Sequence, residues 1–219
     1  MKNVFLILSV SLVGGMLLNG CAKNPLDDMT QEESRIYITQ RDSSAVFDSY
    51  HTFAIVDSVA VVNNEGEGKE LTDGDIQLLQ LLVDKMQERG YTLVDSSQQP
   101  DLGINASRIS HTYLNAVPYP YDYWGYPGYW DPGIWGYPGY DYYFPPGFGY
   151  YPPSFMYYNT QSDVMAIDII DLKNTNKDKG ELKAIWNASL KGEGVLNPSN
   201  YPAEITAVFE QSPYLSTKK

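Results

Sequence analysis

The chain has 219 residues, of which 43% are hydrophobic, and a formal net charge of −12. This acidic excess argues against nucleic acid and anionic lipid as partners, because both require basic patches. A single cysteine excludes a disulfide within the chain, and a chain of this length fits one core of ordinary size.

The N-terminal segment predicts the cellular compartment. A basic start precedes an apolar run from Val4 to Leu18, which is short for a membrane span and typical of a secretory signal. The run ends in a Leu-Asn-Gly-Cys motif that resembles a bacterial lipobox, and its Cys21 is the only cysteine. We therefore expect residues 1–20 to be a lipoprotein signal peptide and Cys21 to be lipidated. The alternative is a plain signal peptide with an incidental cysteine.

A lipidated Cys21 would anchor the chain without a spanning helix, because two or more acyl chains hold a protein stably at a bilayer. We expect residues 21–34 to be the lipidated N-terminus and a flexible polar linker, and residues 35–219 to form a single domain. The predicted location is the cell envelope, on the outer membrane of a Gram-negative cell, with either periplasmic or surface exposure. The membrane is thus the first expected partner.

The domain begins with two predicted strands. Residues 35–39 and the second half of residues 47–56 are rich in β-branched and aromatic side chains, which favour strands. Residues 63–70 are polar and contain glycine, so we expect a loop there.

A helix follows this loop. Thr72 is the expected N-cap, and Gly90 is expected to provide a left-handed C-terminal cap. Apolar residues at spacings of three and four predict the face toward the core, formed by Ile76, Leu79, Val83 and Met86.

The second half of the domain predicts four strands and a closing helix. Residues 91–94 and 101–113 precede a long insertion, and residues 164–172 and 182–190 follow it. The 164–172 segment is apolar on both faces, as in a central strand. The 182–190 segment alternates apolar and polar residues and is expected to cover a core on one side only. The closing helix is expected to contain Pro202 in its first turn, to end at Pro213, and to face inward with Ile205, Val208 and Phe209.

These elements predict an α+β fold with a mainly antiparallel sheet and two helices packed on one face. The expected order is β-β-α-β-β-(aromatic insertion)-β-β-α.

Several short motifs resemble one family of bacterial lipoproteins, the domain-of-unknown-function 4136 family. The motifs are Phe47-x-x-Tyr50-x-Thr52-Phe53, Gly90-Tyr91, Pro100-Asp101-Leu102, Ile167-Asp168-Ile169-Ile170-Asp171, Trp186 and Ser212-Pro213. The resemblance covers most of residues 35–215 except the insertion. Where the family tends to place a basic residue and glycine after the tryptophan, this chain has Asn187-Ala188. The resemblance implies an envelope lipoprotein with a compact α+β fold, and it implies no catalytic residues.

The insertion, at about residues 115–160, is rich in tyrosine, tryptophan, glycine and proline, and it repeats the hexapeptide WGYPGY. Its Pro-Gly pairs suit the centre of type II turns, and its prolines exclude a long helix. One interpretation is a binding platform for an envelope glycan or protein, because tyrosine offers a large face and a hydroxyl at low entropic cost. The residues expected to carry binding are Tyr126, Trp130, Trp135, Tyr137 and Tyr140. The alternative is a low-complexity loop without a single partner, or one that lies across its own sheet.

Other residues give weak signals for chemistry. His51 and His111 both lie in predicted strands, where a partly exposed histidine is commoner than a metal site or a base. Asp168 and Asp171 are expected on opposite faces of one strand, so they form no carboxylate pair. Alternating Asn and Asp between residues 174 and 178 favours a hairpin over a calcium site. We expect a non-catalytic envelope binding or assembly protein without cofactor or metal; the alternatives are a purely structural lipoprotein and, less favoured, an enzyme.

Overall fold

The computed structural model describes residue 30 and residues 32–63, 65–113, 131–145, 160–176 and 178–218. The predicted signal peptide, Cys21, Tyr126 and Trp130 lie outside these residues. The chain divides into two compact units, Met1–Glu33 and Ser34–Lys219, and the described helices and strands belong to the second.

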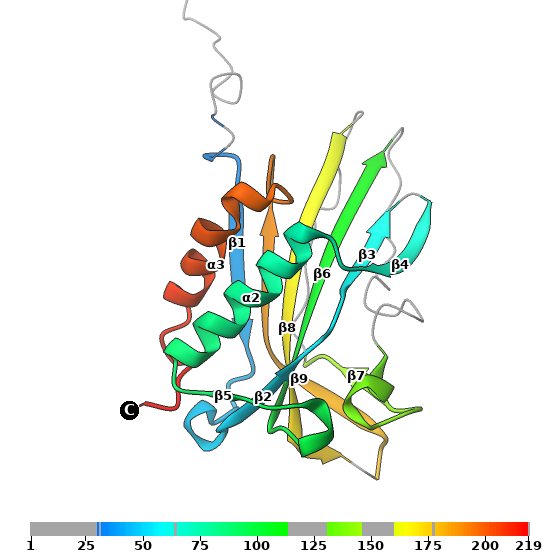
Figure 1. The fold of residues 1–219 in the computed structure, drawn as a ribbon, viewed down its shortest axis with the longest axis vertical. Coiled ribbons are helices and arrows are strands. Elements are labelled where there is room, and N and C mark those ends of the chain that lie inside the picture. The colour runs from blue at the N-terminus through cyan, green and yellow to red at the C-terminus, as the bar shows by residue number, and fades with distance from the viewer. Residues whose placement is uncertain are drawn as a thin grey trace, which may run out of the picture. The chain divides into compact units, whose positions relative to one another are not determined.

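The second unit has an α+β fold built on one large mixed sheet, and its two α-helices cover one face of that sheet (Figure 1). The helices are α2 (Asp73–Glu88) and α3 (Tyr201–Glu210). The strands are β1 (Ile36–Arg41), β2 (Thr52–Ile55), β3 (Val59–Asn63), β4 (Gly66–Glu70), β5 (Thr92–Leu93), β6 (Leu102–Tyr113), β7 (Asp141–Tyr143), β8 (Thr160–Asn176) and β9 (Glu181–Lys191). No helix among the described residues is long and apolar enough to cross a membrane.

The sheet order is β1-β9-β8-β6-β2-β5, with β3 also beside β6, β4 beside β3, and β7 beside β9. The pairs β1–β9, β8–β9 and β6–β8 are antiparallel, in agreement with the predicted mainly antiparallel sheet. The pairs β2–β6, β3–β6, β2–β5 and β7–β9 are parallel, which the sequence did not reveal. The chain crosses from β2 to β6 by way of α2, and such a helical crossover is what allows two strands to run parallel.

The predicted loop at residues 63–70 is wrong for most of its length. β3 and β4 form a hairpin whose turn is closed by the Asn63 side chain, which accepts hydrogen bonds from the backbone N–H groups of Glu65 and Gly66. Gly66 has φ 144°, a conformation that favours glycine. β4 lies at an edge of the sheet, where a polar strand is favoured because it discourages pairing with other chains. The polarity of residues 66–70 is thus explained by their place in an edge strand, and it is no evidence for a loop.

Helix α2 begins where predicted. Thr72 and Asp75 form a reciprocal capping box, and Gly90 has the expected positive φ of 95°. The predicted inward face is only partly correct, because Ile76 is 51% exposed. The buried residues of α2 are Asp75, Leu78, Leu79, Leu82, Val83 and Met86, so the core-facing stripe is rotated from the predicted one.

Strand β9 also departs from its prediction. Nearly all its residues are buried, including Asn187 and Ser189, so both of its faces are covered rather than one. A register shift where β8 residues Ile169 and Ile170 pair with Trp186 and Ala184 interrupts the simple alternation. The polar residues of β9 are thus part of the interior.

Candidate functional site

The described part of the aromatic insertion, residues 131–145, is a turn followed by a short strand. Asp131 Oδ1 accepts a hydrogen bond from Gly133 N at 2.8 Å, which caps the 3-10 turn Pro132–Trp135. Pro138 and Gly139 form the next turn, with Gly139 at φ 80° and Tyr140 N bonded to Tyr137 O. This Pro-Gly pair adopts the predicted type II geometry. β7 then pairs with β9, so the segment is held to the sheet.

Trp135 fixes this segment to the sheet. Its side chain is only 4% exposed and packs against Gly103 of β6, where a Cβ atom would lie 2.9 Å from Trp135 Cε2. The indole Nε1 donates a hydrogen bond to the Tyr142 hydroxyl at 3.0 Å. Gly103 is therefore required for close approach of the ring, and Trp135 supports the segment from beneath.

The tyrosines of the segment are more accessible. The Tyr137 hydroxyl donates to Leu172 O at 3.4 Å, and its ring centroid lies 5.2 Å from that of Tyr140. Both side chains are half-buried, whereas Tyr143 is 40% exposed. Of the predicted binding residues, the structure thus places Trp135 in the core and brings Tyr137 and Tyr140 together at the surface. Tyr126 and Trp130 lie outside the described residues.

A row of polar side chains crosses the face of the sheet that this segment covers. Asn105 of β6, Asp168 of β8 and Asn187 of β9 are direct neighbours in the strand register. Each is at most 1% exposed. The row alternates with Trp186, which contacts α3, so the row faces away from the helices. The strands therefore carry an apolar face under the helices and a polar patch on the other side.

Three polar atoms in this patch have no hydrogen-bond partner among the described residues: Asn105 Nδ2, Asp168 Oδ2 and Ser189 Oγ. Asn187 Nδ2 donates to the other Asp168 oxygen at 2.6 Å. An adjoining hollow of about 10 Å³, bordered by Asn105 and Ile134, is close to the minimum size for one water molecule. Buried polar groups are nearly always paired in folded proteins, so these atoms are an exception that requires a reason.

Burial shifts the titration of groups on this face. It raises the pKa of Asp168 to about 7, against the opposing effect of the Asn187 hydrogen bond. Burial also lowers the pKa of Lys191 to about 8. It raises the pKa of Tyr142, while the neighbouring Asn105 amide and Trp135 indole act in the opposite direction. The face therefore carries hydrogen-bonding groups beside aromatic rings, and burial opposes the charged forms of Asp168 and Lys191.

The other candidate residues from the sequence take part in hydrogen bonds that hold the fold together. His51 is exposed, and its backbone N–H donates to Asp101. Asp171 lies on the face opposite Asp168, as predicted, and accepts a hydrogen bond from the Tyr50 hydroxyl at 2.7 Å. Asn174 also bonds to Asp171, so its role is to hold this network. Within the described part of the chain, no group of three or more His, Cys, Asp or Glu could hold a metal ion.

Comparison with known proteins identifies relatives of unknown function. A family model described as Domain of unknown function (DUF4136) matches residues 38–214. The fold is similar to the crystal structure of a DUF4136 family protein from Bacteroides thetaiotaomicron, with 25% sequence identity and a TM-score of 0.64. That alignment covers 84% of this chain and 99% of the other. No curated protein matches the sequence. The family membership predicted from the short motifs is thereby confirmed.

Proposed function

Because the chain belongs to the DUF4136 family, whose function is not known, we propose from its own residues that it is a lipid-anchored envelope protein that binds or assembles envelope components without catalysis. The contact surface is the aromatic insertion together with the polar sheet face beneath residues 131–145. Its partner is an envelope glycan or protein that offers hydroxyl or amide groups.

The observation that carries this proposal is the set of unpaired polar atoms on Asn105, Asp168 and Ser189. Each buried unpaired group costs a fold about 1–3 kcal/mol. An apolar residue at each position would remove that cost, so the polar residues need a compensating role. Hydrogen bonding to a partner that displaces the aromatic segment would supply one.

The anchor completes the proposal. A lipidated Cys21 would hold the domain at a bilayer, and the acidic body would be repelled from anionic headgroups. The domain would then face soluble or membrane-bound partners rather than the lipid itself. The mass of the mature N-terminal peptide tests this part, and an unmodified Cys21 thiol in the mature protein would contradict it.

A second candidate function is purely structural, and the burial of Trp135 favours it. In that case the aromatic segment serves only to cover its own sheet. The two candidates differ in the role of the tyrosines, since a cover depends on the buried Trp135 more than on the half-buried Tyr140 and the exposed Tyr143.

The deciding experiment is crosslinking and pull-down from intact cells with surface variants of the full chain. Removing residues 119–158 is unsuitable, because it also removes Trp135 and strand β7 from the fold. We compare the wild type with Tyr140→Ser/Tyr143→Ser and with Tyr126→Ser/Trp130→Ser. Val46→Ser, at a residue 59% exposed elsewhere on the domain, is the matched control.

We expect both double variants to lose the crosslinked envelope components while the control keeps them. Thermal unfolding of each purified variant verifies that the fold is intact. Recovery of the same components with all variants would reject the binding proposal and leave the structural role.

A further inference from the structure

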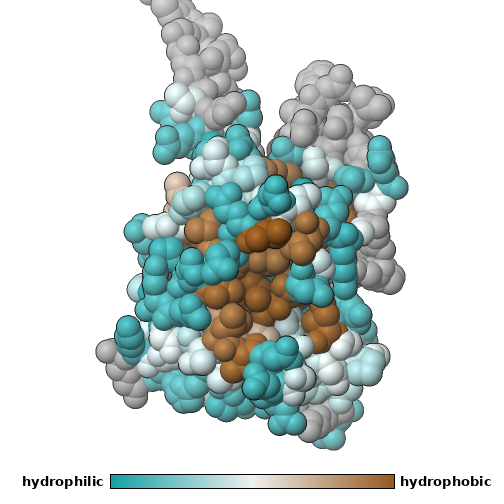
Figure 2. All heavy atoms as spheres, viewed as in Figure 1, coloured by the Kyte–Doolittle hydropathy of each residue, from teal (hydrophilic) through white to brown (hydrophobic). Residues whose placement is uncertain are grey.

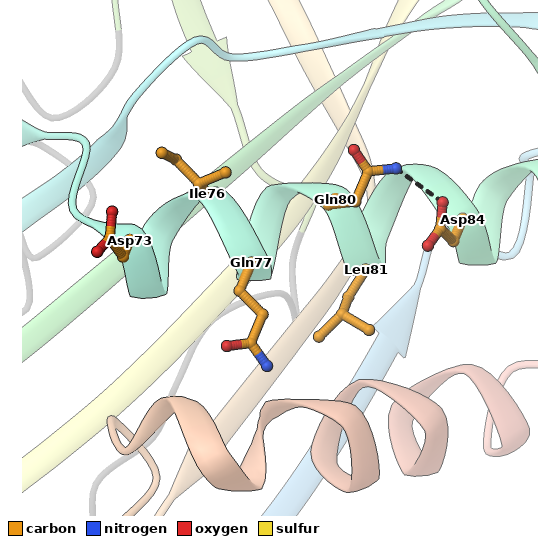
Figure 3. A pocket seen from close by; sticks show the side chains of 6 residues that line it. All are labelled: Asp73, Ile76, Gln77, Gln80, Leu81 and Asp84. Atoms are coloured by element: carbon orange, nitrogen blue, oxygen red, sulfur yellow. Dashed lines mark hydrogen bonds between the residues drawn. The ribbon is translucent and has the colours of Figure 1, made fainter.

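A second surface lies on the opposite side of the sheet, on helix α2. Figure 2 shows apolar side chains gathered at the middle of the helix-bearing face, framed by polar ones. A hollow of about 470 Å³ lies along α2 there. Figure 3 shows its lining side chains, which are Asp73, Ile76, Gln77, Gln80, Leu81 and Asp84. Ile76 is 51% exposed and Leu81 is half-buried, so the hollow offers apolar side chains to a partner.

The helix that lines this hollow is firmly held. Its first turn is closed by the capping box, and Asp75 also pairs with Arg108 at 2.7 Å. Gln77 Nε2 donates to Pro198 O at 3.2 Å. Gly74 approaches Pro198 so closely that a Cβ atom there would lie 2.7 Å from Pro198 Cγ. A partner would thus meet a preformed surface, which reduces the ordering cost of binding.

The charged side chains of the lining, Asp73 and Asp84, are both acidic. Asp84 accepts a hydrogen bond from the neutral amide of Gln80 at 2.8 Å. Basic groups near the helix are engaged elsewhere: Lys85 pairs with Glu88, and the Arg89 guanidinium donates to Phe209 O. The two carboxylates therefore give the hollow a negative field beside its apolar side chains.

The two carboxylates and the apolar side chains of the hollow together indicate what kind of partner could bind there. In a symmetric contact between two copies, the same acidic rim would face itself, and like charges oppose that contact. An anionic lipid surface is repelled for the same reason. A basic amphipathic helix satisfies both features, because its apolar stripe can cover Ile76 and Leu81 while its cations lie near the carboxylates. Asp73 and Asp84 are separated by three helical turns, roughly 16 Å, which matches a short helix.

We propose that the α2 hollow is a docking site for a basic amphipathic helix of a partner protein. This site is independent of the proposed function of the aromatic face, because it lies on the other side of the sheet. The two surfaces would let one anchored domain contact two components.

The test uses the purified full-length chain and a synthetic amphipathic helix of about 18 residues, with leucines on one face and lysines on the other. Fluorescence anisotropy measures binding of this labelled peptide. Two control peptides are a scrambled sequence of the same composition and a version with glutamate in place of lysine. The protein variants are Ile76→Ser, Ile76→Leu and Asp73→Asn/Asp84→Asn, with Val46→Ser as the matched exposed control.

We expect Ile76→Ser to weaken binding of the amphipathic peptide roughly tenfold, because it removes apolar contact without changing charge. Ile76→Leu and Val46→Ser should bind as the wild type does, and the double asparagine variant should bind more weakly. Equal binding of the scrambled peptide, or unchanged binding to Ile76→Ser, would show only general attraction to an acidic protein and overturn the proposal. Tyr140→Ser/Tyr143→Ser should leave peptide binding unchanged. The peptide assay therefore tests the α2 site alone, and the pull-down tests the aromatic face alone.

Discussion

The two faces of the sheet each bury a tryptophan, yet they differ in how completely their polar groups are paired. Under the helices, Trp186 donates to Ser212 Oγ at 2.9 Å and packs 5.9 Å from the Phe209 ring. Under residues 131–145, Trp135 makes a similar bond to Tyr142, but the neighbouring patch keeps three unpaired atoms. The helix face resembles an ordinary core, whereas the aromatic face combines packing with unused hydrogen-bonding capacity.

The helix face has one exception of its own. Glu204 is fully buried and neither of its carboxylate oxygens accepts a hydrogen bond from a described residue, although Arg35 Nη1 lies 3.6 Å away. This carboxyl therefore has a charged partner, while Asp168 on the other face has only the amide of Asn187. The two faces therefore differ in whether a buried carboxyl has a cationic partner, as well as in how many buried polar atoms are unpaired.

The largest expected effect is the loss of stability when either buried tryptophan is replaced by alanine, and this loss should differ between the two. Trp186→Ala should lower the free energy of unfolding by about 3–5 kcal/mol, as for other buried large-to-alanine changes. Trp135→Ala should fall at the lower end of that range, because the three-residue strand β7 can adapt locally. Denaturant unfolding measures the first difference. Hydrogen exchange of the Asp141 amide, which bonds to Gly180 O, should accelerate only in Trp135→Ala.

Equal acceleration of that amide in both variants would mean that the aromatic segment and the helix face unfold as one unit. The expectation that the aromatic segment adapts locally, independently of the helix face, would then be wrong.

The next effect is a pH dependence from Asp168. Its folded pKa of about 7 exceeds the ordinary value of 3.8, so the folded protein holds a proton that the unfolded chain releases between those pH values. Stability therefore falls as pH rises from about 4 to 7, by at most roughly 1.4 kcal/mol per pH unit for one group. Asp168→Asn should flatten this slope. Unfolding curves across this pH range provide the measurement.

A variant that keeps the full slope would show that Asp168 is not the responsible group. Asp163→Asn, on the same strand in a half-buried position, is the matched control for the loss of one carboxylate.

Much of the fold could be predicted because local rules and tertiary packing agree there. Thr72 caps helix α2 as its residue type indicated, and the closing helix packs with Ile205, Val208 and Phe209, as their spacing indicated. The rotation of the α2 stripe could not be read from spacing alone, since Ile76 and Leu78 both fit an apolar periodicity and only the sheet decides between them. The parallel pairs were hidden for a related reason, because pairing direction depends on the path between strands.

The candidate site was harder to predict than the fold. Ser189 lies in the segment that was expected to cover a core on one side only, and the polar face of such a strand ordinarily meets water. Asp168 gave a stronger signal, since it interrupts an apolar segment that was itself read as buried on both sides. Trp135 was expected to carry binding because it lies in the aromatic repeat, and its packing partner Gly103 could only be found in three dimensions.

A variant of Glu204 tests whether the nearby Arg35 cation distinguishes this buried carboxyl from Asp168 on the other face. Burial raises its pKa to about 7, while Arg35 acts to lower it. The folded value again exceeds the ordinary 4.5, so this group also contributes stability that falls as pH rises through that interval. Glu204→Gln should flatten the slope over a narrower pH range than Asp168→Asn, because the pKa of Glu204 rises from 4.5 and that of Asp168 from 3.8, both to about 7. A flattening larger than that of Asp168→Asn would reverse the comparison.

The smallest expected effect compares the two indole hydrogen bonds directly. Ser212→Ala and Tyr142→Phe each remove the oxygen that accepts from an indole N–H, and leaving such a donor unpaired costs about 1–3 kcal/mol. Ser212 is fully buried, whereas Tyr142 is half-buried, so water can replace the Tyr142 oxygen more readily. Ser212→Ala should therefore cost more in denaturant unfolding. A larger loss from Tyr142→Phe would mean that the aromatic face is as sealed as the helix face, and that its unpaired atoms are kept from partners as well as from water.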